Sequence, residues 1–249
     1  MTVDPNPFES PHLLLDGATR HIEALERRVD DLRQTPDWVA IAPDAEGGYF
    51  ISANIRIPPD MKQIAFDIVS NLRSALDHAV FAGTLALTGD ERSNTKFPIG
   101  DTEQEARADV NRSRAKVPAE LLDFLLAFNV HRDGNITVWA LNKLRNTKSH
   151  RVLVPFASTV DYVGESASPG TKATHEWDKA TGRFKMRFEQ SPIFGPPIAA
   201  YTFRLHVLIG TGTFSGEPAL AVFGRMFGEV ERIISAIEAE TTRLIAERS

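Results

Sequence analysis

The sequence predicts an α+β fold in which a helical layer packs on one face of an antiparallel sheet. Several long segments repeat apolar residues at helical spacing, and other runs alternate apolar and polar residues as strands with one buried face do. The strand-like runs mostly come as neighbouring pairs, as hairpins do, and do not alternate singly with helices. This order favours an antiparallel sheet over a parallel one.

Amphipathic helices are expected at 11–33, 60–88, 117–128, 136–149 and 218–247, and the last four form the predicted helical layer. The segment 60–88 has the widest apolar stripe of the chain. Asp133 or Asn135 is placed to cap the helix at 136–149. Pro218 is expected in the first turn of the closing helix, with Ser215 or Gly216 as its cap.

Strands are expected at 38–42, 49–57, 152–154, 158–163 and 201–209, with a hairpin over 175–189 that turns at 178–182. We interpret residues 1–249 as a single domain. It begins with a loosely ordered tail at 1–10, has a helical core at 60–150 and mostly strands at 151–210, and ends with the helix at 218–247.

Composition excludes several classes of function. The formal net charge is −5, which argues against a protein dedicated to coating nucleic acid. The chain has no cysteine, so disulfides, thiolate catalysis and cysteine metal sites are ruled out. The N-terminal sequence MTVDPNPFESPH has no secretory signal pattern, and no apolar run approaches the roughly 20 residues that span a bilayer. A cytoplasmic protein without membrane contact is therefore expected.

The stretch LNKLRNTKSHR at 141–151 is the main candidate for a functional site. At about 100° per residue, Asn142, Asn146 and His150 form one stripe of the predicted helix, and Arg145 lies beside them. Histidine can move a proton from a ribose 2′-hydroxyl, and a guanidinium can stabilise the charge that develops on the phosphate. The alternative is a histidine that favours the helix C-terminus, with polar neighbours that face water.

The pattern of an arginine, four residues and a histidine in RNTKSH resembles the signature of the HEPN superfamily of nucleotide-binding domains. That resemblance implies a helical protein that dimerises and cleaves RNA without a metal ion. Arg145 would stabilise charge, His150 would act as the acid and base, and Asn146 would position the substrate. The same spacing recurs at 73–78, in RSALDH.

Three segments in order resemble an uncharacterised family of bacterial and phage proteins. They are NLRSALDHAVFA at 71–82, KFPIG at 96–100, and LNKLRNTKSHRVLV at 141–154, which ends its helix with Asn-x-x-x-His-Arg. The resemblance implies later strands and a closing helix, and no activity. The family usually has Asp-Lys before His-Arg where this chain has Lys148 and Ser149, so an acid that could orient His150 locally is missing.

The helix at 71–82 carries a second set of polar residues. Arg73 and Asp77 stand four residues apart and can pair on one face, and Asn71, Ser74 and His78 form another polar line. Buried polar groups need partners, because an unsatisfied one costs roughly 1–3 kcal/mol. One interpretation is a structural network that docks this helix on the helix at 136–149. The other is that Asp77 or His78 meets His150 in a composite polar site that includes Asn142.

Other patterns carry less chemistry. The glycine-rich segment 210–216 is expected to be a loop from strand to helix, without a bound cofactor. A set of basic residues on polar sides of strands forms either a phosphate-attracting face or an ordinary solvated one: Arg56, Lys185, Arg187, Arg204 and His206. The histidines have no metal-ligand spacing, and neither a nucleophile elbow nor a phosphate-binding loop is present.

Two classes of function follow from these residues. The protein is either a non-enzymatic binding or interaction module, for which a homodimer through the long helices is one arrangement, or a HEPN-like ribonuclease or its inactive relative. RNA is a partner only in the second class. No cofactor and no metal are expected in either.

Overall fold

The structure is a computed structural model of the chain, and it describes residues 6–43, 49–53, 55–90, 95–113, 116–146, 156–163, 173–178, 183–188, 202–210 and 212–248. The elements in chain order are α1 (Glu9–Arg33), β1 (Val39–Pro43), β2 (Tyr49–Ala53), α2 (Pro59–Thr88), α3 (Glu103–Ser113), α4 (Ala119–Leu126), α5 (Ile136–Arg145), β3 (Phe156–Val163), β4 (Ala173–Asp178), β5 (Arg183–Phe188), β6 (Thr202–Ile209) and α6 (Ala219–Arg248). The predicted α+β class is confirmed, with helices dominating.

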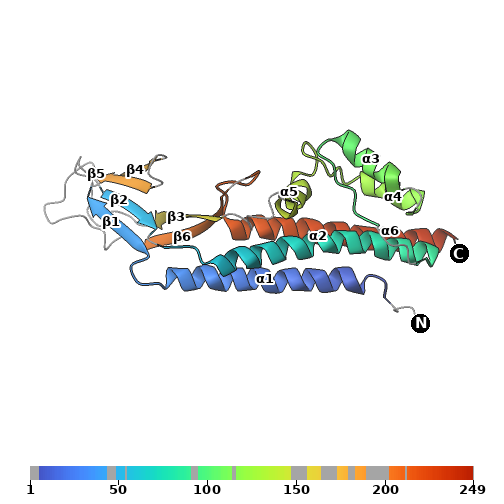
Figure 1. Cartoon of the computed structure of the whole chain (residues 1–249), viewed down its shortest axis with the longest axis horizontal. Helices are drawn as coiled ribbons and strands as arrows, with labels where there is room; N and C mark the ends of the chain where they lie inside the picture. The colour runs from blue at the N-terminus through green and yellow to red at the C-terminus, as the bar shows by residue number, and fades with distance from the viewer. Residues whose placement is uncertain are drawn as a thin grey trace.

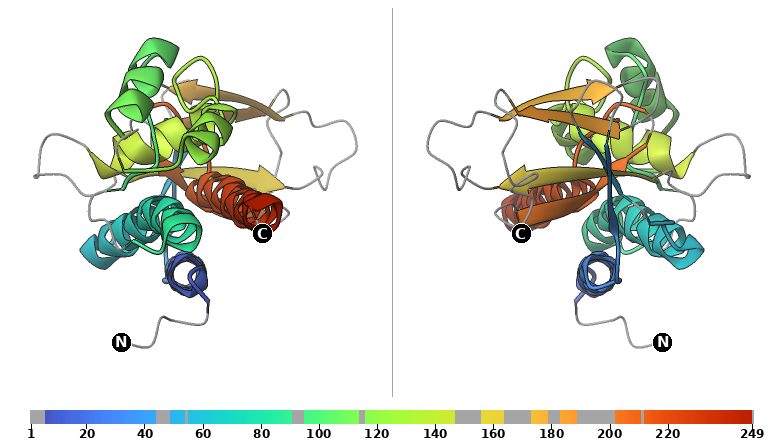
Figure 2. Two further views of the ribbon diagram at one scale, coloured as in Figure 1. Left: turned by 90° about the vertical axis from the view of Figure 1, so that its right-hand side faces the viewer. Right: turned by 90° about the vertical axis from the view of Figure 1, so that its left-hand side faces the viewer.

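Three long helices set the shape of the molecule (Figure 1). α1, α2 and α6 run side by side along the long axis, and the strands lie beyond one end of them. The shorter helices α3, α4 and α5 lie on the side of this layer opposite to α1, as the end views in Figure 2 also show. α2 is the central helix, because it contacts α1, α5 and α6.

The limits of α2 follow from its sequence. Pro58 is extended and Pro59 occupies the first turn, where the missing N–H of proline costs nothing. At the other end Gly89 adopts a left-handed conformation with φ of 66°, and its N–H donates to the carbonyl of Leu85 at 2.7 Å. Glycine adopts this conformation without a Cβ penalty, so the helix ends here.

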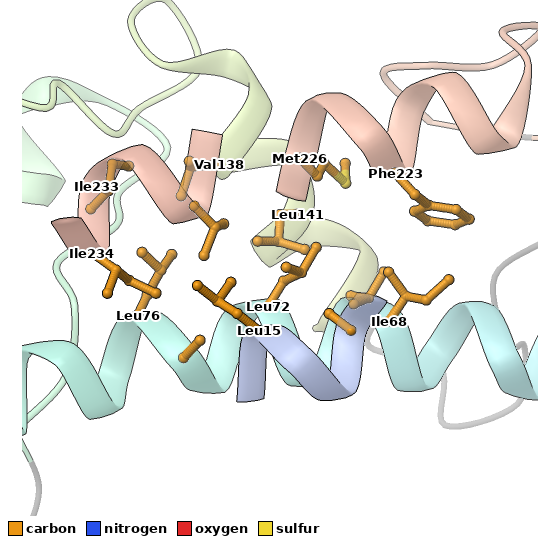
Figure 3. Packing of buried hydrophobic residues seen from close by; sticks show 14 of the residues in the cluster. Leu15, Ile68, Leu72, Leu76, Val138, Leu141, Phe223, Met226, Ile233 and Ile234 are labelled. Carbon is orange, nitrogen blue, oxygen red and sulfur yellow. The ribbon is translucent and has the colours of Figure 1, made fainter. Parts of the chain in front are cut away.

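The core lies where α2 meets its neighbours, and Figure 3 shows this packing from close by. α2 contributes Ile68, Leu72 and Leu76, each fully buried. The residues that face them from the other helices are Leu15 of α1, Val138 and Leu141 of α5, and Phe223, Met226, Ile233 and Ile234 of α6. Burial of each large side chain contributes about 1.5–3 kcal/mol, so this interface holds the helical layer together.

The strands form two antiparallel sheets. The larger has the order β1-β2-β5-β4, and the smaller pairs β3 with β6. Asp178 of β4 lies opposite Arg183 of β5, so the two arms of the hairpin predicted over 175–189 are antiparallel neighbours. The strands expected at 38–42 and 49–57 also pair antiparallel, with Ile41 of β1 opposite Ile51 of β2. The sheets connect to the helical layer through β6, whose buried side chains Leu205, Val207 and Ile209 belong to the same core.

Several boundaries differ from those expected. α1 begins at Glu9 with Phe8 buried before it, so residues placed in a loose tail belong to the fold. β2 ends at Ala53 and does not continue to residue 57. The charged segment 103–113 is the helix α3, which its sequence pattern did not predict. Two buried residues four apart, Ala106 and Val110, are its whole apolar face. α6 begins at Ala219, so Pro218 precedes its first turn.

Candidate functional site

The candidate site lies where α2, α5 and the segment 95–100 meet. Arg73 and Asp77 are one helical turn apart on α2 and point toward α5 and this segment. α5 starts at Ile136, where the side chain of Asn135 accepts the N–H of Val138 at 3.2 Å, so Asn135 and not Asp133 is the cap of the two that the sequence offered. This start position places Asn142 next to α2.

The guanidinium of Arg73 is the centre of a polar network. Arg73 is only 5% exposed, and three of its nitrogens have partners. Nε donates to Asn142 Oδ1 at 3.2 Å, Nη1 donates to Asp77 Oδ1, and Nη2 donates to the carbonyl of Phe97 at 3.3 Å. A buried charge is tolerated only when it is paired and hydrogen-bonded, and Arg73 meets both conditions.

Asp77 joins two parts of the chain through its carboxylate. Besides the bond from Arg73, its Oδ1 atom accepts the backbone N–H of Phe97 at 2.9 Å. Both main-chain polar groups of Phe97 are therefore bound to side chains of α2. The Phe97 ring is fully buried, so the network fixes an apolar anchor of the segment 95–100.

The α5 side of the network consists of two asparagines and one arginine. Asn142 Oδ1 accepts from Arg73 and also from Asn146 Nδ2 at 2.9 Å. Asn146 is the C-cap residue that follows the end of α5 at Arg145, and its side chain is exposed. Arg145 Nη1 lies 3.9 Å from Asp77 Oδ2, and the Arg145 side chain is 37% exposed. Arg145 is thus the outermost charged member of the network.

The structure brings together Arg73, Asp77, Asn142, Arg145 and Asn146, all of which the sequence singled out. It does not bring in His78, whose Nδ1 lies 2.7 Å from Ser10 Oγ of α1. Successive helix residues are about 100° apart, and here Asp77 faces the segment 95–100 while His78 faces α1.

His150 lies outside the described residues, as do Lys148, Ser149 and the end of the expected helix at 136–149. The contact between His150 and Asp77 that one interpretation requires therefore stays a prediction. The strand expected at 152–154 also lies outside, and so does part of the hairpin turn at 178–182.

Two neighbouring polar clusters were not predicted. Asp101 accepts from Trp139 Nε1 at 2.9 Å and lies 2.5 Å from Lys143 Nζ, which ties α5 to the start of α3. The Lys143 hydrogen bond lowers the pKa of Asp101 below its usual value. On the other side of α5, Asn135 Nδ2 donates to Glu229 Oε1 of α6 at 2.6 Å. In the sequence, only the presence of side-chain donors at Trp139 and Asn135 could have indicated these two contacts.

The remaining candidates do not add to the site. The segment 210–216 is a loop from β6 to α6, in which Ser215 Oγ donates to the carbonyl of Gly210 at 3.2 Å. Arg204 of β6 is exposed. Arg56 is exposed too, but it lies beyond the end of β2 and not on a strand as expected, and the side chains of Lys185 and Arg187 lie outside the described part. Among the described residues, no group of three or more acidic or histidine side chains is placed to hold a metal ion.

Comparisons with known proteins identify no relative, so the candidate site is interpreted from its geometry. Searches against protein-family models, curated proteins and solved structures find no match for the chain. Of the helices in the described part, none has the length and apolar character needed to cross a membrane.

Proposed function

We propose that this protein is a non-enzymatic binding or interaction module that acts in the cytoplasm. The observation that carries the proposal is that the polar groups at the α2–α5 junction form hydrogen bonds within the protein itself. Arg73 is buried with three bonded nitrogens, and Asp77 binds Arg73 and the Phe97 N–H. A catalytic base must reach a substrate proton within hydrogen-bond distance, and a carboxylate occupied in this way holds the fold together instead.

Arg145 supports the same proposal. Arg145 Nη1 lies 3.9 Å from the Asp77 carboxylate of its own chain, beyond hydrogen-bond distance, so Arg145 lies at the exposed edge of the network and keeps donors for a partner. This geometry suits an interaction module whose network fixes the angle and register of two helices. A homodimer through the long helices remains part of the proposal, and light scattering after size exclusion tests it by measuring the mass in solution.

The second candidate is the HEPN-like ribonuclease or its inactive relative, with Arg145, Asn146 and His150 in catalytic roles. The observation in its favour is the exposure of Arg145 and Asn146, because solvent-facing donors can reach an RNA phosphate. In this candidate RNA is the partner and the reaction needs no metal ion.

An RNA cleavage assay separates the two candidates. Single-stranded RNA with a 5′ label is incubated with wild type, Arg145→Ala and His150→Ala, in the presence of EDTA. Arg107→Ala is the matched control, because Arg107 is an exposed arginine paired with one acid, Glu103. If the protein is a binding module, none of the four proteins should cleave RNA above the buffer background. Cleavage that is lost in Arg145→Ala and His150→Ala and kept in Arg107→Ala would establish the ribonuclease.

A further inference from the structure

The outer edge of the α2–α5 network contains two guanidinium groups and a single carboxylate. Arg73 and Arg145 both approach Asp77, so the three groups together carry a formal charge of +1. Arg73 lies in the interior and holds Asp77 by a direct hydrogen bond. Arg145 lies at 3.9 Å, beyond hydrogen-bond distance, and its charge is only partly compensated.

The oxygens that face Arg73 are already in use, and Asp77 Oδ2 is the acceptor that faces Arg145 at 3.9 Å. Arg73 Nε can only donate, so the atom of Asn142 that faces it is the oxygen, and this oxygen also accepts from Asn146 Nδ2. Asp77 Oδ1 accepts twice, and the carbonyl of Phe97 accepts from Arg73. The orientation of both asparagine amides is thereby determined by chemistry, with Nδ2 of Asn142 directed away from Arg73.

The donors, by contrast, are in surplus at the exposed edge. Within the described part of the chain, the Arg145 guanidinium makes no hydrogen bond, and the Nδ2 atom of Asn142 donates to no acceptor. Asn146 Nδ2 uses one of its two hydrogens. In sequence, residues 147–155 read TKSHRVLVP and include no acidic residue that could supply the second carboxylate.

We infer that Arg145, with the amides of Asn142 and Asn146, is a binding point for an oxyanion, either a phosphate or a carboxylate group of a partner. A planar guanidinium with free N–H groups binds either group by charge-assisted hydrogen bonds, and the amide donors add further bonds to its oxygens. This inference rests on the proposed binding module and names the chemistry of its ligand. The partner supplies the negative charge that the network lacks.

Titration of the full chain with inorganic phosphate tests the inference. The side-chain signals of Arg145 Nε, Asn142 Nδ2 and Asn146 Nδ2 are followed by ¹⁵N NMR at constant ionic strength, kept with sodium chloride so that screening does not change. We expect these three signals to shift together and to saturate. A second titration with acetate separates the two sources, since the tighter-binding anion identifies a phosphate-bearing or a carboxylate-bearing partner.

Two substitutions sharpen the test. Arg145→Gln should raise the dissociation constant at least about tenfold, the effect of losing a charge-assisted hydrogen bond. Asn142→Asp places a second carboxylate beside Arg73 and Arg145, keeps the acceptor that Arg73 uses, and should abolish saturable binding. Arg107→Gln removes an even more exposed arginine on α3, 59% exposed against 37% for Arg145, and should leave the dissociation constant unchanged.

Three results would overturn the inference: linear shifts without saturation for both anions, equal weakening by Arg145→Gln and Arg107→Gln, or undiminished binding by Asn142→Asp. These results are distinct from a failure of the proposed function. RNA cleavage by the wild type would contradict the proposed binding module whether or not phosphate binds. Absence of anion binding would contradict only this ligand and not the proposed module.

Discussion

The carboxylate of Asp77 accepts the backbone N–H of Phe97 at 2.9 Å, and the carbonyl of the same residue accepts from Arg73. Two charged side chains of α2 thus hold one peptide segment by its main chain. The ring of Phe97 is buried in the core beside them, so polar and apolar contacts fix the same residue.

Removal of the Asp77 carboxylate tests this relationship. Asp77→Ala leaves the buried guanidinium of Arg73 without its counter-ion, so the free energy of unfolding should fall by about 3 kcal/mol or more. Urea unfolding measures the loss, and hydrogen exchange should show faster exchange of the Phe97 amide. Asp67→Ala is the control on the same helix, since Asp67 accepts only an exposed bond from Gln63 and its loss should cost about 0.5 kcal/mol or less. Equal effects of the two substitutions would contradict the role of Asp77.

The close approach of α2 to α6 depends on Gly83. An added Cβ there would lie 2.9 Å from Thr241 Oγ1 and 3.1 Å from Leu121 Cδ2. Overpacking costs about 1–3 kcal/mol, and the better helix propensity of alanine returns up to about 1 kcal/mol. We expect Gly83→Ala to lower the free energy of unfolding by about 1–2 kcal/mol net, as measured by urea unfolding.

The control is Gly228→Ala in α6, where an added Cβ meets open space. This substitution should stabilise the protein by about 0.5–1 kcal/mol, because it only reduces the backbone freedom of the unfolded chain. Combining Gly83→Ala with Thr241→Ala should recover part of the loss. Stabilisation by Gly83→Ala alone would show that the helices can move apart at no cost.

The cap of α5 and its bond to α6 depend on Asn135. Asn135→Ala removes both and should lower the free energy of unfolding by about 1–2 kcal/mol. Asn135→Asp retains the cap, yet places a carboxylate where the Asn135 amide donates to Glu229 at 2.6 Å. We therefore expect Asn135→Asp to lower the free energy of unfolding near pH 7, because the new carboxylate repels that of Glu229. This loss should shrink in acid, where one of the two carboxyl groups becomes protonated. Urea unfolding at pH 7 and pH 4.5 measures it, and an equal loss at both would contradict the charge repulsion.

Asp101 gives the α5–α3 contact a defined pH dependence. Its pKa is lowered below the ordinary value of 3.8, first by the Lys143 hydrogen bond and then by the bond from Trp139. A lowered folded-state pKa means that the stabilisation is fully present above the ordinary value and disappears as the pH falls through the folded-state pKa. The indole N–H signal of Trp139 should therefore titrate with a midpoint below 3.8.

¹⁵N NMR between pH 6 and pH 2 detects this midpoint, and Asp101→Asn serves as the control because it cannot ionise. In that variant the indole signal should stay constant through the same range. A wild-type midpoint at or above 3.8 would mean that Lys143 does not hold the carboxylate.

How much of the fold the sequence predicted varies with each element. α2 was predicted almost to its ends, since a wide apolar stripe lies between two prolines and a glycine, each with its own backbone constraint. α3 was missed because it buries only Ala106 and Val110, and a short stripe of small residues in a charged segment carries little periodic signal. β2 stops before the alternating pattern does, as apolar alternation indicates a buried face but not where pairing ends.

The candidate site was predicted in its side chains and not in its main chain. The spacing of Arg73 and Asp77 indicated an ion pair, and the stripe of Asn142 and Asn146 indicated a polar side of α5. Phe97 joins them through its backbone N–H and carbonyl, groups that every residue except proline possesses, so no residue type could reveal the contact. His78 was named as an alternative to Asp77 in the composite site, but one residue along a helix turns the side chain by about 100°, and His78 contacts Ser10 of α1 instead.

The packing of α6 against α2 has a consequence for synthesis on the ribosome. The apolar face of α2 is complete once residue 88 has been made, yet its covering residues Ile233, Ile234 and Ile237 come near the end of the chain. About 145 residues, or roughly 7–30 seconds of translation at 5–20 residues per second, separate residue 88 from Ile233. During that interval α1 can already cover one side of α2, but the side that α6 covers stays exposed on the nascent chain, which is the kind of surface that chaperones bind.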